Sequence, residues 1–177
     1  MKILLIALPV VILLLFVVIN AQSDEFRITR STTISAPPSG IFARINDLHR
    51  FQEWSPWAKL DPTAKNTFSG PPQGVGAAMQ WEGNSKIGQG TMTITESRPN
   101  ELVRMQLDFK KPVASTANVD FILQPQGQQT QVTWDMSGKK VFASKAMGLV
   151  MNMDKMVGGE FEKGLATLKA QAEAATA

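Results

Sequence analysis

Residues 26–45 read FRITRSTTISAPPSGIFARI, and this stretch decides the fold. In its first part Phe26 and Ile28 begin an alternation of apolar and polar residues, which predicts a strand with one buried face. The Ala-Pro-Pro run at residues 36–38 ends the strand, because proline lacks the N–H that a strand donates. The apolar spacing that follows predicts a short amphipathic helix, and a second short helix is expected around residues 48–51.

Beyond this opening, a Gly- and Pro-rich stretch leads into a series of further alternating segments. These segments are centred on residues 79–83, 92–94, 103–109, 117–123 and 132–136. Turn signals separate them, such as Arg98-Pro99-Asn100 and Pro125-Gln126-Gly127. Strands joined by such short links favour an antiparallel meander with one buried face and one solvated face.

The end of the chain returns to helical periodicity. Apolar residues recur at spacings of three and four from Met147 to Ala172, with charged residues on the other side. The pattern predicts one long helix from about Phe142 to Ala174, with Gly158-Gly159 as its weak point. We therefore expect an α+β fold in which a curved antiparallel sheet of about seven strands wraps around this helix and leaves a cavity between them.

Composition narrows the possible functions. The 177 residues carry a net charge of +3 that is spread along the chain, without the dense Lys and Arg cluster typical of nucleic-acid binding. The chain has no cysteine, which excludes disulfides, thiolate metal sites and a cysteine nucleophile. His49 is the only histidine, and the carboxylates near it form no metal-binding pattern. We expect no metal, no cofactor and no nucleic-acid partner.

An almost uninterrupted apolar run from Ile3 to Ile19 follows Lys2. Its length exceeds the about 7–15 residues of a signal-peptide core and reaches the lower end of the about 17–25 residues of a spanning helix. A poor peptidase site around Ala21 also favours an uncleaved, single-pass membrane anchor over a signal peptide. We expect residues 1–23 to be this anchor and residues 24–177 to be a globular domain on the extracytoplasmic side, as in a bacterial inner membrane that faces a periplasm.

Several short sequence segments of the globular part resemble those of a known family. They are residues 30–38 (RSTTISAPP), 41–43 (IFA), 54–57 (WSPW) with 61–62 (DP), 76–81 and 88–90 (GQG). From Phe26 to about Ala172 the chain resembles the START-like, or SRPBCC, superfamily with the helix-grip fold, and within it the bacterial polyketide cyclase/dehydrase and lipid-transport-like proteins. The resemblance implies a ligand cavity between the sheet and the C-terminal helix. It does not choose between lipid carriers, hormone- and allergen-type binders and aromatic cyclases.

Large side chains expected on the inner surface are the candidates for lining such a cavity. We select Trp54, Trp57, Trp81, Met105, Phe121, Trp134, Met147, Met151 and Asp154. Trp81 and Trp134 occupy inward strand positions, where they either pack the core or form a cavity wall with an N–H donor. Trp54 and Trp57 are expected in a loop, as a pocket mouth or as a structural plug. The methionines at the start of the predicted C-terminal helix, Met147 and Met151 among them, either belong to the ordinary core or form an adaptable cavity wall.

Three functions are compatible with these residues. The first is a membrane-tethered module that binds a small apolar or lipid-like molecule without catalysis. The second is a cyclase- or dehydratase-type enzyme in which Asp154 or His49 transfers the proton. The third is a protein-interaction module of the cell envelope, with residues 54–57 as its contact surface. The small stock of acid–base residues favours the first function.

Overall fold

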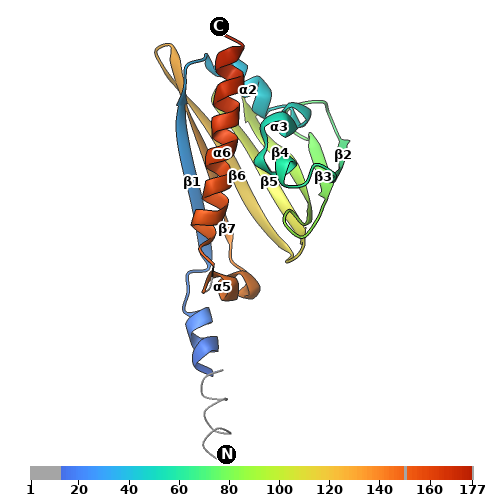
Figure 1. The fold of residues 1–177 in the computed structure, drawn as a ribbon, viewed down its shortest axis with the longest axis vertical. Helices are drawn as coiled ribbons and strands as arrows, with labels where there is room; N and C mark the ends of the chain where they lie inside the picture. Colours follow the sequence, from blue (N-terminus) through green and yellow to red (C-terminus); the bar gives the residue numbers. More distant parts are fainter. Residues whose placement is uncertain (1–12, 150, 177) are drawn as a thin grey trace, which may run out of the picture.

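The computed structural model of the protein describes residues 13–149 and 151–176 (Figure 1). Within this part of the chain, seven antiparallel strands form one open sheet in the order β1-β7-β6-β5-β4-β3-β2. The strands are β1 (Glu25–Ile34), β2 (Lys65–Ser69), β3 (Ala78–Glu82), β4 (Gln89–Arg98), β5 (Leu102–Lys111), β6 (Ser115–Gln126) and β7 (Gln129–Lys139). The helices are α2 (Pro38–Ile45), α3 (Leu48–Trp54), α4 (Pro56–Leu60), α5 (Phe142–Gly148) and α6 (Met153–Ala174). The predicted α+β class, with an antiparallel sheet and a C-terminal helix, is confirmed.

The first strand joins the last strand of the meander and not its neighbour in sequence. β1 pairs with β7 along its whole length, from Glu25 opposite Lys139 to Ile34 opposite Thr130. From β2 to β7, each strand pairs antiparallel with the next. The helices α2, α3 and α4 fill the connection between β1 and β2. The pairing of β3 through β7 confirms the meander that the short turns predict, whereas β2 lies in the Gly- and Pro-rich stretch, where no strand was predicted.

The helices cover one face of the sheet, and the buried core lies between them (Figure 1). α6 lies against β1, α2 packs on β5 and β6, and α4 packs on α6. In Figure 1 the short helices cover the upper part of this concave face, and α6 alone continues toward the lower end, which is the end nearest α5. The lower part of the concave face therefore has less cover than the upper part.

A helical segment over residues 13–20 precedes β1 and leaves the domain at the end nearest α5 (Figure 1). The predicted anchor begins in residues 1–12, which lie outside the described part of the chain. Among the described residues, no helix is both long enough and apolar enough to cross a membrane. The anchor over residues 1–23 stays a prediction.

The C-terminal region consists of two helices, so the prediction of one long helix is wrong. α5 ends at Gly148 and α6 begins at Met153. Asn152 caps α6, because its side chain accepts a hydrogen bond from the backbone N–H of Lys155 at 2.9 Å. The expected weak point at Gly158-Gly159 lies inside the continuous helix α6. The C-terminal region is therefore divided at the N-cap of α6 and not at the pair of glycines.

The two neighbouring glycines of α6 offer a matched pair of substitutions. A Cβ on Gly158 would lie 2.1 Å from Nη2 of Arg30, whereas a Cβ on Gly159 would meet no described atom within 4 Å. We expect Gly159→Ala to raise the free energy of unfolding by up to about 1 kcal/mol, because alanine favours the helix. Gly158→Ala should gain less or lose stability, because the Arg30 guanidinium must move. Urea unfolding measures both, and equal gains would show that the Arg30 contact is unimportant.

Asp61 ties the end of α4 to the β3–β4 connection. Its Oδ1 accepts hydrogen bonds from the hydroxyl and the backbone N–H of Thr63, at 2.7 Å and 3.1 Å. Its Oδ2 accepts one from the backbone N–H of Asn84 at 2.7 Å. The Thr63 hydroxyl and then the Asn84 N–H lower the pKa of the Asp61 carboxyl, because they stabilise its charged form.

This lowered pKa predicts a pH dependence of stability. A carboxyl whose pKa is lower in the folded state contributes stability above its unfolded pKa of about 4 and loses it as the pH falls through the folded pKa. We expect acidification to reduce the free energy of unfolding of the wild-type protein. In the Asp61→Asn variant, the free energy of unfolding should fall less steeply with pH. Urea unfolding of both proteins from about pH 7 to about pH 3 measures the two slopes. Identical slopes would show that Asp61 makes no contribution.

Candidate ligand-binding face

An aromatic cluster occupies the space between the sheet and α6 at the level of Trp134. The rings of Trp134 in β7 and Phe161 in α6 are stacked, with centroids 4.2 Å apart and planes 6° apart. Trp54 and Trp57 meet Trp134 edge to face, with centroids at 5.6 Å and 5.5 Å. Phe121 of β6 lies 4.7 Å from Trp134. At this level, side chains fill the place where the sequence predicts a cavity.

Residues 54–57 do not form the loop that the sequence predicts. α3 ends at Trp54, and α4 begins at Pro56, whose fixed φ suits the first turn of a helix. Trp54 is fully buried, and its Nε1–H donates to the carbonyl oxygen of Arg44 at 3.1 Å. Trp57 is half-buried and packs against the core. The tryptophan pair is therefore part of the cluster.

Trp134 is tightly packed but keeps one free polar group. α6 approaches it closely at Gly164, where an added Cβ would lie 2.8 Å from Cζ3 of Trp134. The indole N–H of Trp134 is buried and has no hydrogen-bond partner within the described ranges. A buried donor left unpaired costs about 1–3 kcal/mol. A ligand oxygen that accepted this hydrogen bond would remove that cost.

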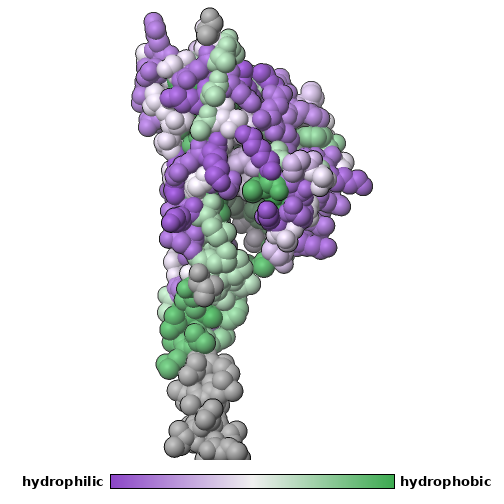
Figure 2. Space-filling model, viewed as in Figure 1, coloured by the Kyte–Doolittle hydropathy of each residue, from purple (hydrophilic) through white to green (hydrophobic). Residues whose placement is uncertain are grey.

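Below the cluster, the concave face is apolar and only partly covered. We call this region the lower concave face and define it by the half-buried side chains of Phe26, Trp57, Trp81, Leu107, Phe109 and Val157. Strand register places Phe26, Gly138, Ala117 and Leu107 in one row across β1, β7, β6 and β5. Figure 2 shows that the surface is hollowed beside the lower half of α6. The protein therefore has an open apolar surface here.

Two aromatic rings of this face lie close against glycines of neighbouring strands. A Cβ on Gly138 would lie 3.0 Å from Cε1 of Phe26, and a Cβ on Gly90 would lie 2.5 Å from the Trp81 ring. The Trp81 Nε1–H donates to the carbonyl oxygen of Ile87 at 3.1 Å, which fixes that ring. These contacts hold the two aromatic rings against the sheet.

Two further hollows in the described chain lie at the edge of the lower concave face and beside α3. One, of about 450 Å³, lies at the ends of β1, β6 and β7 and shares Phe26 with the lower concave face. The other, of about 220 Å³, lies beside α3 and includes His49 and Phe68. No residue of α6 lines either hollow. The chain thus offers an open face next to a packed core, and the enclosed cavity between sheet and helix stays a prediction.

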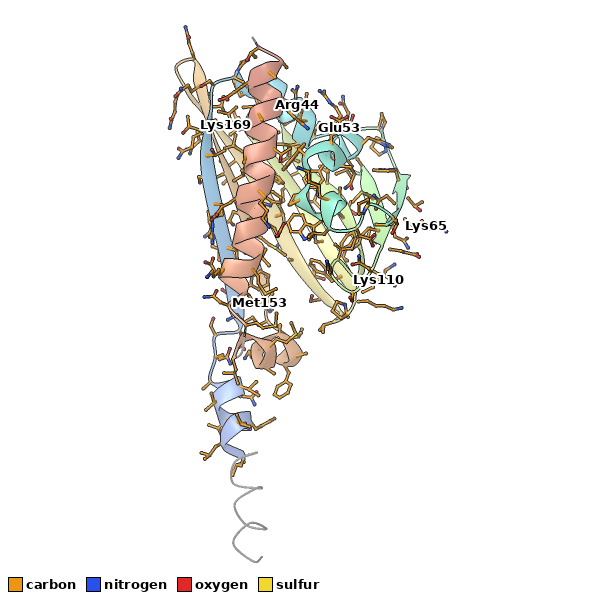
Figure 3. All side chains as sticks on the ribbon, in the orientation of Figure 1. Arg44, Glu53, Lys65, Lys110, Met153 and Lys169 are labelled. Carbon is orange, nitrogen blue, oxygen red and sulfur yellow. The ribbon has the colours of Figure 1, made fainter. Side chains whose placement is uncertain are left out.

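The two candidate proton-transfer residues have separate partners. Asp154 is exposed at the start of α6 and forms an ion pair with Arg30 at 3.0 Å. Arg30 also pairs with Glu162 at 2.7 Å, so it joins β1 to α6, the helix that carries the labelled Met153 and Lys169 in Figure 3. The hydrogen bond from Arg30 lowers the pKa of the Asp154 carboxyl. The His49 ring stacks on Phe68 with centroids 3.7 Å apart.

The structure brings together some of the predicted cavity-lining residues. Trp54, Trp57, Phe121 and Trp134 form the aromatic cluster, and Met105 and Trp81 share the concave face with them. The other three lie outside it, because they are exposed around α5 and the start of α6: Met147, Met151 and Asp154.

Sequence reasoning missed several residues of the lower concave face. Leu107 and Phe109 share the inward side of β5 with Met105, so the alternation of this strand already places them on the correct face. Phe26 and Val157 lie at inward positions of β1 and α6 and pack against the core as well. The missing information was the extent to which the helices cover each strand.

Comparison with known proteins places this arrangement in a family. The family model described as polyketide cyclase/dehydrase and lipid transport matches residues 25–173. The chain belongs to this family. No curated protein sequence matches this member of the polyketide cyclase/dehydrase and lipid transport family.

Solved structures of the same fold extend over most of this family member. The Aha1 dimer from Colwellia psychrerythraea has a TM-score of 0.60 at 20% identity, with 84% of this chain and 96% of that chain covered. Protein jhp0584 from Helicobacter pylori has a TM-score of 0.62 at 8% identity, with 86% and 90% covered. Protein CV1439 from Chromobacterium violaceum has a TM-score of 0.58 at 15% identity, with 85% and 97% covered. At such identities the likeness is one of fold.

Proposed function

We propose that this member of the family is a membrane-tethered protein that binds a small apolar or lipid-like molecule on the lower concave face. The observation that carries the proposal is the partly covered apolar wall beside the lower half of α6, formed by side chains such as Trp81, Leu107 and Phe109. A ligand that removes such a wall from water gains about 25 cal/mol per Å² of apolar surface. The family description, which includes lipid transport, supports the same class of ligand.

In this proposal, Trp134 provides the polar contact that recognises the ligand. Small-molecule sites usually combine a large apolar wall with a few polar groups that fix the orientation of the ligand. The lower concave face borders the aromatic cluster, and Trp57 belongs to both. The buried indole N–H of Trp134 lacks a partner among the described residues. A ligand oxygen reaches this donor only when the rings packed around Trp134 move apart, and a carbonyl or hydroxyl oxygen then satisfies it.

The tether in this proposal is an N-terminal membrane helix over residues 1–23. Its support is the apolar run from Ile3 to Ile19 behind Lys2, which orients the domain toward the extracytoplasmic side of a bacterial inner membrane. The helical segment over residues 13–20 leaves the domain at its lower end (Figure 1). The lower concave face then lies close to the bilayer, where apolar molecules accumulate.

The two other functions find less support. A cyclase or dehydratase needs an acid–base group at the ligand, but Asp154 is paired with Arg30 on the surface and His49 is stacked on Phe68. An interaction module based on residues 54–57 loses most of its contact surface, because Trp54 and Ser55 are buried.

Native mass spectrometry of a fragment over residues 24–177, purified from the envelope of its own host, tests ligand binding. The whole buried core lies between Ile28 and Ala172, so we expect this fragment to fold. The expected result is a bound molecule of discrete mass that organic solvent releases. A bare protein that also fails to bind a lipophilic fluorescent probe would contradict the proposal.

A further inference from the structure

The exposed apolar side chains of the described chain gather at its lower end. Apart from Val75, the strongly exposed large hydrophobic residues lie in the segment over residues 13–20 or around α5. Those around α5 form what we call the basal patch: Phe142, Met147, Leu149, Met151 and Met156. Figure 2 shows this end as a continuous hydrophobic surface below a mostly hydrophilic domain. Large exposed apolar patches usually mark a surface that contacts another apolar body.

Several contacts hold α5 beside the chain that joins the N-terminal segment to β1. The side chain of Lys145 in α5 forms an ion pair with Asp24. The Nε2 of Gln22 donates to the carbonyl oxygen of Lys145 at 3.1 Å. The rings of Phe16 and Phe142 lie 5.8 Å apart. The basal patch and the apolar segment over residues 13–20 are therefore one continuous surface.

Lysines precede and lie within α5 beside the basal patch, and the acidic residues at its edges, Asp24 and Asp154, are paired with Lys145 and Arg30. From Met136 to Met153 the sequence contains Lys139, Lys140 and Lys145 and no acidic residue. Lys145 is paired with Asp24, and Lys139 lies opposite Glu25 in the strand register, which leaves Lys140, directly after β7, to act on the surroundings. Apolar side chains flanked by lysines are typical of segments that lie in the headgroup region of a bilayer, where anionic lipids attract the lysines.

We infer that the basal patch is a bilayer-contacting surface that inserts its Phe, Leu and Met side chains among phospholipids. The inference rests on the tether of the proposed function, because continuity with the N-terminal segment identifies the bilayer as the occupant. The row of Phe26, Gly138, Ala117 and Leu107 lies at the same end of the sheet as α5, which follows β7. Contact through the basal patch therefore turns the lower concave face toward the lipid surface and shortens the path of an apolar ligand.

Site-specific fluorescence tests this contact in the full-length protein. The chain contains no cysteine, so a single introduced cysteine takes up an environment-sensitive dye at one known position. We would label Met147→Cys in the basal patch, Leu14→Cys in the N-terminal segment and Val75→Cys, which is exposed in the β2–β3 connection. Each protein is reconstituted into vesicles of phosphatidylcholine and phosphatidylglycerol, with or without spin-labelled lipid as a quencher. Met151→Cys repeats the Met147 measurement at a second exposed position.

The expected result is a blue-shifted emission at positions 147 and 151 that spin-labelled lipid largely quenches, with water-like and unquenched emission at position 75. Quenching at position 14 together with water-like emission at 147 and 151 would overturn the bilayer contact and leave the tether intact. Unquenched emission at position 14 would overturn the tether and the bilayer contact with it. A blue-shifted emission at position 147 that spin-labelled lipid does not quench, and that increases with protein concentration, would also overturn the inference. Such a result would indicate contact between two copies of the chain.

Discussion

Replacing Trp134 by alanine is expected to lower the free energy of unfolding by about 3–5 kcal/mol, which makes it one of the two strongest effects we predict. Trp134 is almost fully buried, stacks on Phe161 and touches Trp54, Trp57 and Phe121. Its removal would leave a cavity that these rings, fixed on four different elements, can close only in part. Urea unfolding of the wild-type and variant fragments over residues 24–177 measures the change.

Two further substitutions control this experiment. Trp57→Ala removes a ring of the same kind that is only half-buried, and we expect it to cost clearly less. Trp134→Phe keeps an aromatic ring on Phe161 and removes the N–H that lacks a partner among the described residues, so we expect a change within about 1.5 kcal/mol. A loss below about 1 kcal/mol for Trp134→Ala would contradict a packed core at this level.

The sheet was predictable from sequence because its side chains alternate with a period of two. On β5 the inward residues Met105, Leu107 and Phe109 alternate with Arg104 and other polar residues, and a slip of one residue would expose the apolar set to water. The short turns between the later strands then leave few arrangements other than a meander. Pairing of β1 with β7 was not predicted, since no local turn connects these two strands.

The division of the C-terminal region was not predictable from periodicity, and its physical cause is clear. The apolar spacing continues through Met147 and Met151, yet these side chains are exposed on the basal patch. Hydrophobic periodicity records which residues are apolar and not whether the apolar surface is buried in the protein. The capping side chain of Asn152, which does define the break, is a single local feature inside that pattern.

The inward direction of several side chains was predictable, but not which of them would stay partly exposed on the lower concave face. The alternation assigns Trp81, Phe121 and Trp134 to the inner surface correctly, and the structure confirms that these side chains pack on the concave face. The length of strand that each helix covers depends on tertiary packing. This coverage decides whether an inward side chain is fully buried in the core or half-buried on the lower concave face. Trp54 is a second example in which tertiary packing was not predictable. The motif over residues 54–57 resembles a loop in sequence, but α3 and α4 bury Trp54.

Leu107→Asp is expected to weaken binding of an apolar ligand by about 10- to 100-fold. Leu107 is half-buried on the lower concave face, so a bound molecule completes the removal of its side chain from water. Loss of the remaining burial corresponds to about half of the 1.5–3 kcal/mol for a fully buried leucine, and dehydration of the carboxylate under the ligand adds to this loss. Displacement of a lipophilic fluorescent probe measures the affinity of the wild-type and variant fragments over residues 24–177.

Asn118→Asp is the matched control, because it adds the same charge to the neighbouring strand on the opposite face. Asn118 is exposed and lies opposite Gln106 in the strand register, so its side chain points away from the lower concave face. We expect this variant to bind the probe like the wild type. If both substitutions weakened binding equally, the cause would be the overall charge. If only Asn118→Asp weakened binding, the ligand would bind in the hollow at the ends of β1, β6 and β7, which Asn118 lines.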